Sequence, residues 1–504
     1  MSFPSGNLLR EFKGDLRAPL PLHPFEKALT VVAALNVCSL PWMLGGMRPW
    51  AQFISLGISL VAFILALVPR NYDGDLVRGD PYRIQPAKKL LHWPLFWIGL
   101  VFFGYVLIQA FNPAWEFVQM EKSWGMRQIA HIEWLPTGMR TPFEMMNPWR
   151  QMMIWGAPFI LVSALWAGFT RRKSVINLLT AIVANATILA IVGIVARATA
   201  NGSILWLIES RKDYAYASFI YKNHAGSFFA LALGIAIALA VYYHRQAIRK
   251  HRRSSPAVLF ILAAMIAAVA VLQSYSRAAI IITGAFLVVV SLIGLVRLIR
   301  KSNAKSMLLV ISLFAVYLTG FTALGSKLVN STLTLNRFEV LSESSSVWRR
   351  QTAWDAGLEM ANDKPAYGWG SGGFRFLFPK YQYPRPELLR PEWNKNLFYF
   401  WEFIHNDYLQ LLIETGRVGS VWITLGFMFY AFLYLRRGGL HDLTSLTLLG
   451  ASGITFAHAA VDFPMQNPAI LTTFAVSLAL ALSLVTLERR ASNAPLRSRS
   501  LETN

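Results

Sequence analysis

Cysteine is almost absent from this sequence. Cys38 stands alone among the 504 residues, so no disulfide can form within the chain. Clusters of metal ligands are missing as well, because His131 and Glu133 have no cysteine or third histidine nearby. We therefore expect neither a metal nor another cofactor, and we expect any segment outside a membrane to be held together by packing.

Charged residues are also scarce, since 15% of the residues are charged whereas 55% are hydrophobic. The hydrophobic residues come in blocks of about twenty, the length that crosses a bilayer as a helix. The sequence thus predicts an all-α polytopic membrane protein with about twelve transmembrane helices. The predicted spans are residues 28–46, 51–69, 94–111, 151–169, 176–198, 225–243, 257–273, 278–299, 307–325, 418–435, 443–462 and 468–487.

Acidic residues are fewer than basic ones, 26 against 48, which gives a formal net charge of +22. A basic chain can bind nucleic acid, but here the basic residues cluster in every second loop between the apolar blocks. This alternation follows the positive-inside rule, so we expect no nucleic acid and place both termini in the cytoplasm, with basic loops that touch anionic membrane lipids. Segments 112–150, 199–224 and 326–417 then face the periplasm.

Five segments follow from this topology. Residues 1–27 are a cytoplasmic N-terminal segment, residues 28–325 carry spans one to nine, and residues 326–417 form a large helical periplasmic loop. Residues 418–487 carry spans ten to twelve, and residues 488–504 form a cytoplasmic tail. The first apolar block lacks a small-residue cleavage site, so we expect it to be retained as the first span.

A histidine opens the polar run HNDYLQLLIETGRVG before the tenth span. His405 can titrate near neutral pH and take a proton from a hydroxyl, which makes it the best candidate for catalysis. We expect a helix to begin near Phe398, with Ile404 and Tyr408 on its apolar face and Gly416 as its left-handed terminator. On such a helix His405 stands about 16 Å from the helix end. Periodicity alone favours a solvated surface histidine.

The long loop before this run has a helical part and an aromatic part. Val347, Trp354, Leu358 and Ala361 repeat at helical spacing, and the turn YGWGSGGFRFLFPKYQYP follows. Its aromatic residues can stack against sugars or lie on lipid headgroups, although packing explains most of them.

Two charged residues lie at the predicted outer ends of spans. Arg277, in the turn SYSR between spans seven and eight, stands beside apolar residues. A charge there is costly unless it is functional or paired, and an arginine that snorkels to headgroups fits the position equally well. Asp462, at the end of span eleven, is expected first as the structural partner of an arginine and second as a catalytic group.

Four further stretches accompany the His405 run. They are FIYKNHAGSFFALALG, QSYSRAAIIITGAF, RRQTAWDAGLEMANDKPAYGWGSGGFRFLFPKY and HAAVDFPMQNPA. Together with the His405 run, they resemble the O-antigen ligase and polymerase family of bacterial membrane glycosyltransferases, in the family's order. The family signature is a histidine, a small polar residue, nine residues, a glycine, two residues and a glycine, as in the run itself. This collinearity favours a catalytic His405.

The resemblance implies a GT-C-like enzyme that moves a glycan from undecaprenyl diphosphate to an acceptor hydroxyl without a metal. His405 would be the base, with Asn406, Asp407 or Glu414 as alternative orienters of its ring. Arginines at the outer face would hold the donor diphosphate, which makes Arg277 a candidate clamp.

A second cation for the diphosphate has several candidates. The family usually carries an arginine about nine residues before the Asn that opens span six, and here that position is Tyr214. The nearby cations are Arg211, Lys212 and Lys222, of which we prefer Arg211 and Lys222. Arg349 and its neighbour match the family's basic start of the loop helix, and they fit a solvated face as well.

Three acceptor classes share this chemistry: lipid A core for a ligase, a glycan for an O-antigen or exopolysaccharide polymerase, and a protein for an oligosaccharyltransferase. Polymerases more often show basic clusters in two outer loops, and here only the Arg211 region fits. We therefore favour a ligase of the bacterial inner membrane. A lipid-linked glycan transporter would need internal repeats and midplane charges, which the sequence lacks.

Overall fold

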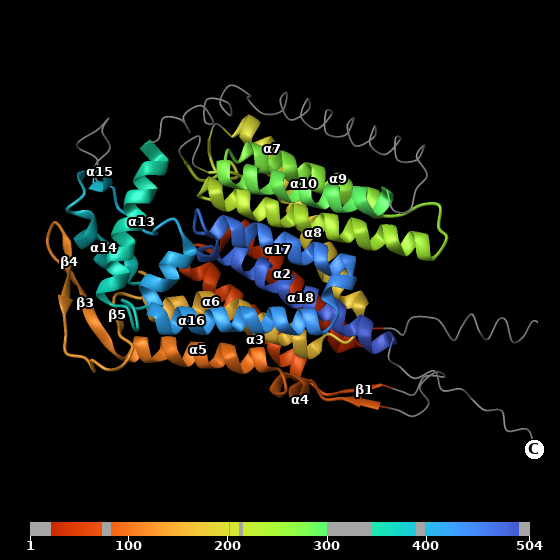
Figure 1. Cartoon of the computed structure of the whole chain (residues 1–504), viewed down its shortest axis with the longest axis horizontal. Helices are drawn as coiled ribbons and strands as arrows, with labels where there is room; N and C mark the ends of the chain where they lie inside the picture. The colour runs from red at the N-terminus through yellow and green to blue at the C-terminus, as the bar shows by residue number, and fades with distance from the viewer. Residues whose placement is uncertain are drawn as a thin grey trace, which may run out of the picture.

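Long helices running side by side make up most of this protein (Figure 1). The computed structural model describes residues 22–72, 82–200, 202–210, 215–299, 345–389 and 399–492. Within these ranges, eight helices are long and apolar enough to cross a membrane. They are α3 (Pro49–Leu67), α5 (Pro94–Phe111), α6 (Pro148–Gly168), α7 (Arg172–Thr199), α8 (Lys222–Arg249), α10 (Arg277–Ile299), α16 (Asp407–Arg436) and α18 (Pro468–Ser492).

Three further apolar helices match predicted spans. They are α2 (Pro24–Trp42), α9 (Ala257–Gln273) and α17 (Leu443–Ala459). Eleven of the twelve predicted blocks therefore overlap a helix, and the block at residues 307–325 lies outside the described residues. The prediction of a mostly helical membrane protein is confirmed.

The helix ends follow from local sequence. Proline occupies the first position of α3, α5 and α6, where its missing N–H costs no hydrogen bond and its fixed φ suits the helix. Asn147 caps α6 by accepting a hydrogen bond of 2.9 Å from the N–H of Arg150. Asp442 caps α17 in the same way, through the N–H of Thr444 at 2.9 Å.

One end of the bundle carries the segments between the membrane helices (Figure 1, left). We call it the His405 end. Its helices are α13 (Ser345–Asp363), α14 (Phe374–Gln382) and α15 (Pro386–Leu389), and its strands are β3 (Pro113–Gln119), β4 (Trp124–Gln128) and β5 (Gly138–Arg140). The strand order is β4-β3-β5, with β4 antiparallel and β5 parallel to β3. The sequence did not predict this sheet, because its strands are too short to show a clear alternation.

Aromatic packing holds this end together, as the sequence predicted. Trp369, Phe374, Phe376 and Tyr381 are buried in one core with residues of α13 and the sheet. These four rings therefore serve packing and are not free to stack on sugars. Tyr383, in contrast, is 79% exposed.

The predicted helix start near Phe398 is wrong, because α16 begins at Asp407. The side chain of Asn406 accepts hydrogen bonds of 3.0 Å from the N–H groups of Tyr408 and Leu409, which fixes the helix start there. His405 precedes the cap and has a φ of 56°. The histidine therefore lies on an irregular segment, and its predicted height on a helical rod does not apply.

Gly416 adopts the predicted positive φ, but it bends α16 and does not end it. Its φ of 63° and ψ of −171° are accessible almost only to glycine. The Gly-rich turn fits into the bend: the N–H groups of Trp369 and Gly370 donate to the carbonyls of Ile413 and Glu414 at 2.8 and 3.0 Å. The turn thus satisfies carbonyls that the bend releases from helical bonding.

The opposite end of the bundle carries shorter elements (Figure 1, right). They are the hairpin β1 (Arg70–Tyr72) and β2 (Tyr82–Ile84), the helix α4 (Pro86–Leu91) and the 3-10 helix η2 (Gly439–His441). α8 runs between the two ends.

Candidate active site

A cavity of about 740 Å³ lies at the His405 end. That volume is within the range of small-molecule sites. Its wall combines the segment after η1 (Leu44–Gly46), the start of α8, the loop with α13 and α14, and η3 (Pro464–Gln466). Segments from across the chain therefore build one site.

His405 lies in the wall of this cavity. Its ring meets Phe463 edge-on, with the ring centroids 4.8 Å apart, and meets Trp401 edge-on at 5.7 Å. The side chain is 23% exposed. The aromatic contacts hold the ring in one orientation while leaving an edge for a ligand.

Asp462 is the partner of His405. Its Oδ1 lies 3.2 Å from Nδ1 of the histidine, and its side chain is 1% exposed. The same carboxylate lies 3.6 Å from Nη2 of Arg350 and accepts hydrogen bonds from Tyr221 and Asn223. The expected pairing of Asp462 with an arginine is therefore present, and the histidine joins it.

The protonation of this pair follows from its surroundings. Burial alone would raise the pKa of the Asp462 carboxyl, but the hydrogen bond from His405 and the charges of His405 and Arg350 hold this pKa well below its usual range. An ionised carboxylate only accepts hydrogen bonds, so Nδ1 of His405 carries the proton. In the neutral ring Nε2 is then the unprotonated nitrogen, which is the form a general base needs.

Five arginines also line the cavity: Arg48, Arg150, Arg349, Arg350 and Arg375. Among the described residues that line the cavity, Glu402 is the one carboxylate, and its oxygen lies 3.9 Å from Arg375. The cavity therefore carries a strong excess of positive charge and suits an anionic ligand.

Neutral groups hold the guanidinium of Arg150, a buried residue. Arg150 donates to the carbonyls of Glu144 at 2.5 Å and Met47 at 3.1 Å, and to the side chain of Gln52 at 3.1 Å. Within the described ranges, no carboxylate lies within ion-pair distance of Arg150. Its charge is positioned without being neutralised.

The arginines of α13 link the loop to the rest of the site. Arg349 donates to the hydroxyl of Tyr399 at 2.7 Å, and Arg350 donates to the carbonyl of Val461 at 2.9 Å. α13 therefore contacts both the segment that carries His405 and the turn that carries Asp462.

Two of the predicted donor cations, Arg277 and Lys222, are not among the described residues that line this cavity. Arg277 is the first residue of α10 and Lys222 the first of α8, whereas Arg211 lies outside the described residues. α8 and α10 approach closely at Gly226, where a Cβ would lie 2.8 Å from the side chain of Ser276. The first turn of α10, which Arg277 opens, therefore packs against the first turns of α8.

The three predicted orienters of the His405 ring have other partners. Asn406 caps α16. Asp407 accepts from the N–H of Met465 at 2.8 Å, and Glu414 accepts from the N–H of Gly372 at 2.9 Å. Asp462 contacts the ring instead, because the chain folds the turn after α17 onto His405, and local spacing does not reveal such a contact between segments.

Tyr408, predicted on the apolar face of the helix after His405, does not line the cavity. Its hydroxyl donates to the carbonyl of Phe456 at 2.8 Å, and it is 49% exposed. It connects α16 to α17.

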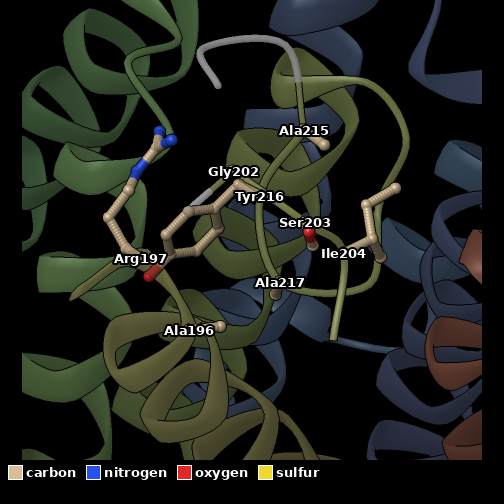
Figure 2. A pocket seen from close by; sticks show the side chains of 9 residues that line it. Ala196, Arg197, Gly202, Ser203, Ile204, Ala215, Tyr216 and Ala217 are labelled. Atoms are coloured by element: carbon tan, nitrogen blue, oxygen red, sulfur yellow. The ribbon is translucent and has the colours of Figure 1, made fainter. Parts of the chain in front are cut away.

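A second cavity lies nearby, at the end of α7 (Figure 2). Its volume of about 30 Å³ holds roughly one water molecule. Figure 2 shows the Arg197 guanidinium beside the Tyr216 ring, 5.6 Å from its centroid. Arg197 also donates to the carbonyl of Gln273 at 2.9 Å. This cavity is too small for a diphosphate.

The sequence analysis missed Arg48, Arg150 and Arg375 as site residues. One signal was present: the positive-inside rule concentrates Lys and Arg in cytoplasmic loops. Arg150 lies at the end of segment 112–150, which was assigned to the periplasm, and Arg48 lies in the short turn MRPW after the first predicted span. A basic residue in a loop on the side away from the cytoplasm is therefore a candidate for binding an anionic substrate.

Comparison with known proteins supports the predicted family. Residues 262–424 match the family model described as O-antigen ligase, and no curated protein matches the chain. The matched region starts in α9 and ends in α16, so it contains α13 and His405. It supports a membrane glycosyltransferase of ligase or polymerase type. Residues 262–424 therefore carry a similarity to the O-antigen ligase family that supports the predicted family.

Proposed function

We propose that this protein transfers a glycan from undecaprenyl diphosphate to an acceptor hydroxyl, as an O-antigen ligase whose acceptor is lipid A core. One observation carries the proposal. His405, paired with the buried Asp462, lies in the wall of a cavity that five arginines make strongly positive. The pair supplies a base, and the arginines supply fixed charge for a diphosphate.

In the proposed reaction, the acceptor oxygen attacks the anomeric carbon of the donor sugar while its proton moves to Nε2 of His405. The bond between that carbon and the diphosphate oxygen breaks, and undecaprenyl diphosphate leaves with the bonding electrons. The diphosphate is a good leaving group, so no general acid is needed. Asp462 stabilises the imidazolium that forms.

The diphosphate site is proposed on the cavity arginines. Arg150 and Arg375 are candidates for direct contact with the diphosphate. One guanidinium group can bind two phosphate oxygens at once, and fixed positive charge stabilises the anion that develops as the diphosphate leaves. We keep Arg277 and Lys222 as proposed ligands of the donor next to the cavity wall.

We also propose the orientation in the membrane. The His405 end faces the periplasm, both termini are cytoplasmic, and about twelve spans form a GT-C-like bundle in the inner membrane. The basic loops support this orientation. Arg172, Arg245, Arg249 and Lys250 lie at the opposite end, as the positive-inside rule requires of a cytoplasmic face.

A transfer assay with purified protein tests the proposal. The protein in detergent is given an undecaprenyl diphosphate glycan, with lipid A core, free glycan or a protein acceptor in separate reactions. Transfer to lipid A core is expected. Lengthening of the glycan would instead identify a polymerase, and a glycosylated protein would identify an oligosaccharyltransferase.

The His405→Ala variant isolates the base. Transfer should be lost, while the protein stays folded in detergent. His441→Ala is the matched control, because His441 is exposed in η2 at the opposite end of the bundle. Transfer by His405→Ala at the wild-type rate would refute the assignment.

A further inference from the structure

A basic cavity of about 210 Å³ lies at the end of the bundle opposite His405. Arg172 contributes from the start of α7 and Thr444 from the start of α17. The other lining residues belong to the last turns of α8 and its C-cap. They are Tyr242, Arg245, Gln246, Arg249 and Lys250. Their spacing puts them along one face of the helix.

Cations outnumber carboxylates at this cavity. Asp442 is the nearby acid, and its oxygens lie 3.0 Å from Arg172 and 3.9 Å from Arg245. The same carboxylate caps α17. In the part of the chain that the structure describes, one carboxylate stands against the four lining cations, which leaves the cavity positive. The N-terminal ends of α7 and α17 add partial positive charge.

The length of α8 gives the depth of this cavity in a membrane. α8 has 28 residues, which corresponds to about 42 Å. A bilayer with its headgroup regions is about 40–45 Å thick. Tyr221, directly before α8, lines the His405 cavity, and Arg249 at the end of α8 lines the basic cavity. Figure 1 shows α8 running along the bundle between them. The two cavities therefore lie at the headgroup levels of opposite leaflets.

Exposed apolar side chains stand on the same helix ends. Ile248 on α8 is 61% exposed, and Leu440, just before α17, is 56% exposed. A ligand with a phosphate and acyl chains matches this combination of charge and apolar surface. The volume is below the usual 300–1,000 Å³ of small-molecule sites, so a lipid headgroup fits better than a nucleotide sugar.

We propose that this cavity binds the phosphate headgroup of an anionic phospholipid in the leaflet opposite the His405 end. The proposal does not depend on glycan transfer. Arg245, Arg249 and Lys250 bind the phosphate, and the acyl chains lie along the exposed apolar side chains of the helix ends.

Native mass spectrometry of the full chain in detergent tests this site. Phosphatidylglycerol or phosphatidylcholine with the same acyl chains is titrated into the protein. The variant Arg245→Gln/Arg249→Gln/Lys250→Gln removes three charges from the cavity. The control Lys27→Gln/Arg83→Gln/Lys88→Gln removes three exposed charges from other elements at the same end.

We expect one phosphatidylglycerol to bind the wild type and the control more tightly than phosphatidylcholine does. The cavity variant should lose affinity on the order of 100-fold, since each cation near an anionic lipid contributes about fivefold. Excess inorganic phosphate should not displace the lipid. Equal affinity in the cavity variant would overturn the site. If inorganic phosphate displaced the lipid, the cavity would be a site for a soluble anion, and the proposal of a phospholipid site would be wrong.

Discussion

The Nδ1 atom of His405 lies 3.2 Å from Oδ1 of Asp462, a residue 57 positions later in the chain. The contact joins the segment before α16 to the turn between α17 and α18. Asp462 is buried behind the wall of the cavity, and His405 forms part of the wall. The carboxylate is therefore placed to orient the ring, and the ring is placed to meet a substrate.

Replacing Asp462 by Asn keeps the size of the side chain and removes its charge. We expect kcat to fall by about 10²–10⁴-fold, because the ring loses both its orienter and the charge that stabilises its protonated form. KM for the donor should change little, since Asp462 does not line the cavity. Steady-state kinetics measure both quantities. An unchanged kcat would show that Asp462 has no role in catalysis.

The same variant should change the pH dependence of stability. The pKa of Asp462 is lower in the folded protein than in the unfolded chain. Its contribution to stability is therefore complete above the unfolded pKa of about 4 and is lost as the pH falls below it. The difference in unfolding temperature between wild type and variant should be constant from about pH 6 to 8 and shrink below about pH 4.

Arg375→Gln tests the charge of the cavity. A lost hydrogen bond to a charged group costs about 1.5–3 kcal/mol, so KM for the donor should rise by about 10-fold to 100-fold. Arg385→Gln is the control in the same loop, because its guanidinium is held by Glu359 at 2.7 Å and does not line the cavity. Equal KM values for the two variants would argue against an arginine clamp at this place.

Arg277→Lys tests the clamp that the sequence suggested. Lysine keeps the charge but cannot bind two phosphate oxygens through a planar fork. We expect KM for the donor to rise roughly tenfold, the equivalent of one charge-assisted hydrogen bond. If the folded variant had the KM of the wild type, Arg277 would not bind the diphosphate, and the cavity arginines alone would remain as its proposed ligands.

Gly416→Ala tests the bend in α16. A Cβ at this position would collide with the carbonyl of Ala366 and with the N–H of Gly368, and the positive φ adds strain. We expect a loss of about 1–3 kcal/mol in stability. The measurement is the unfolding temperature in detergent. Gly57→Ala is the control, because a Cβ there meets nothing within 4 Å. Equal unfolding temperatures would show that the bend tolerates a side chain.

Membrane helices were the most predictable part of this fold. Apolar blocks of the right length leave few alternatives, since a backbone in lipid must satisfy its own hydrogen bonds. The start of α16 was harder, because apolar periodicity extended upstream of Asn406 while the cap decided the boundary. The sheet β4-β3-β5 was missed because short strands depend on contacts between segments.

The sequence predicted the histidine of the candidate site, but it did not predict most of the residues around it. His405 stood out through its titratable ring and the motif around it. Asp462 was recognised as the partner of an arginine, but its contact with His405 depends on how α17 and α18 pack. Arg150 and Arg375 come from separate segments and meet only in the fold.

The cavity wall limits how this chain can be divided into modules. Arg48 and Arg150 precede the matched region 262–424, and Asp462 follows it. A fragment cut to that region would keep His405 but lose its carboxylate and part of the positive wall. A chimera with a relative would therefore have to exchange three parts together. They are the helices up to α6, the loop that carries α13 and His405, and the helices α17 and α18.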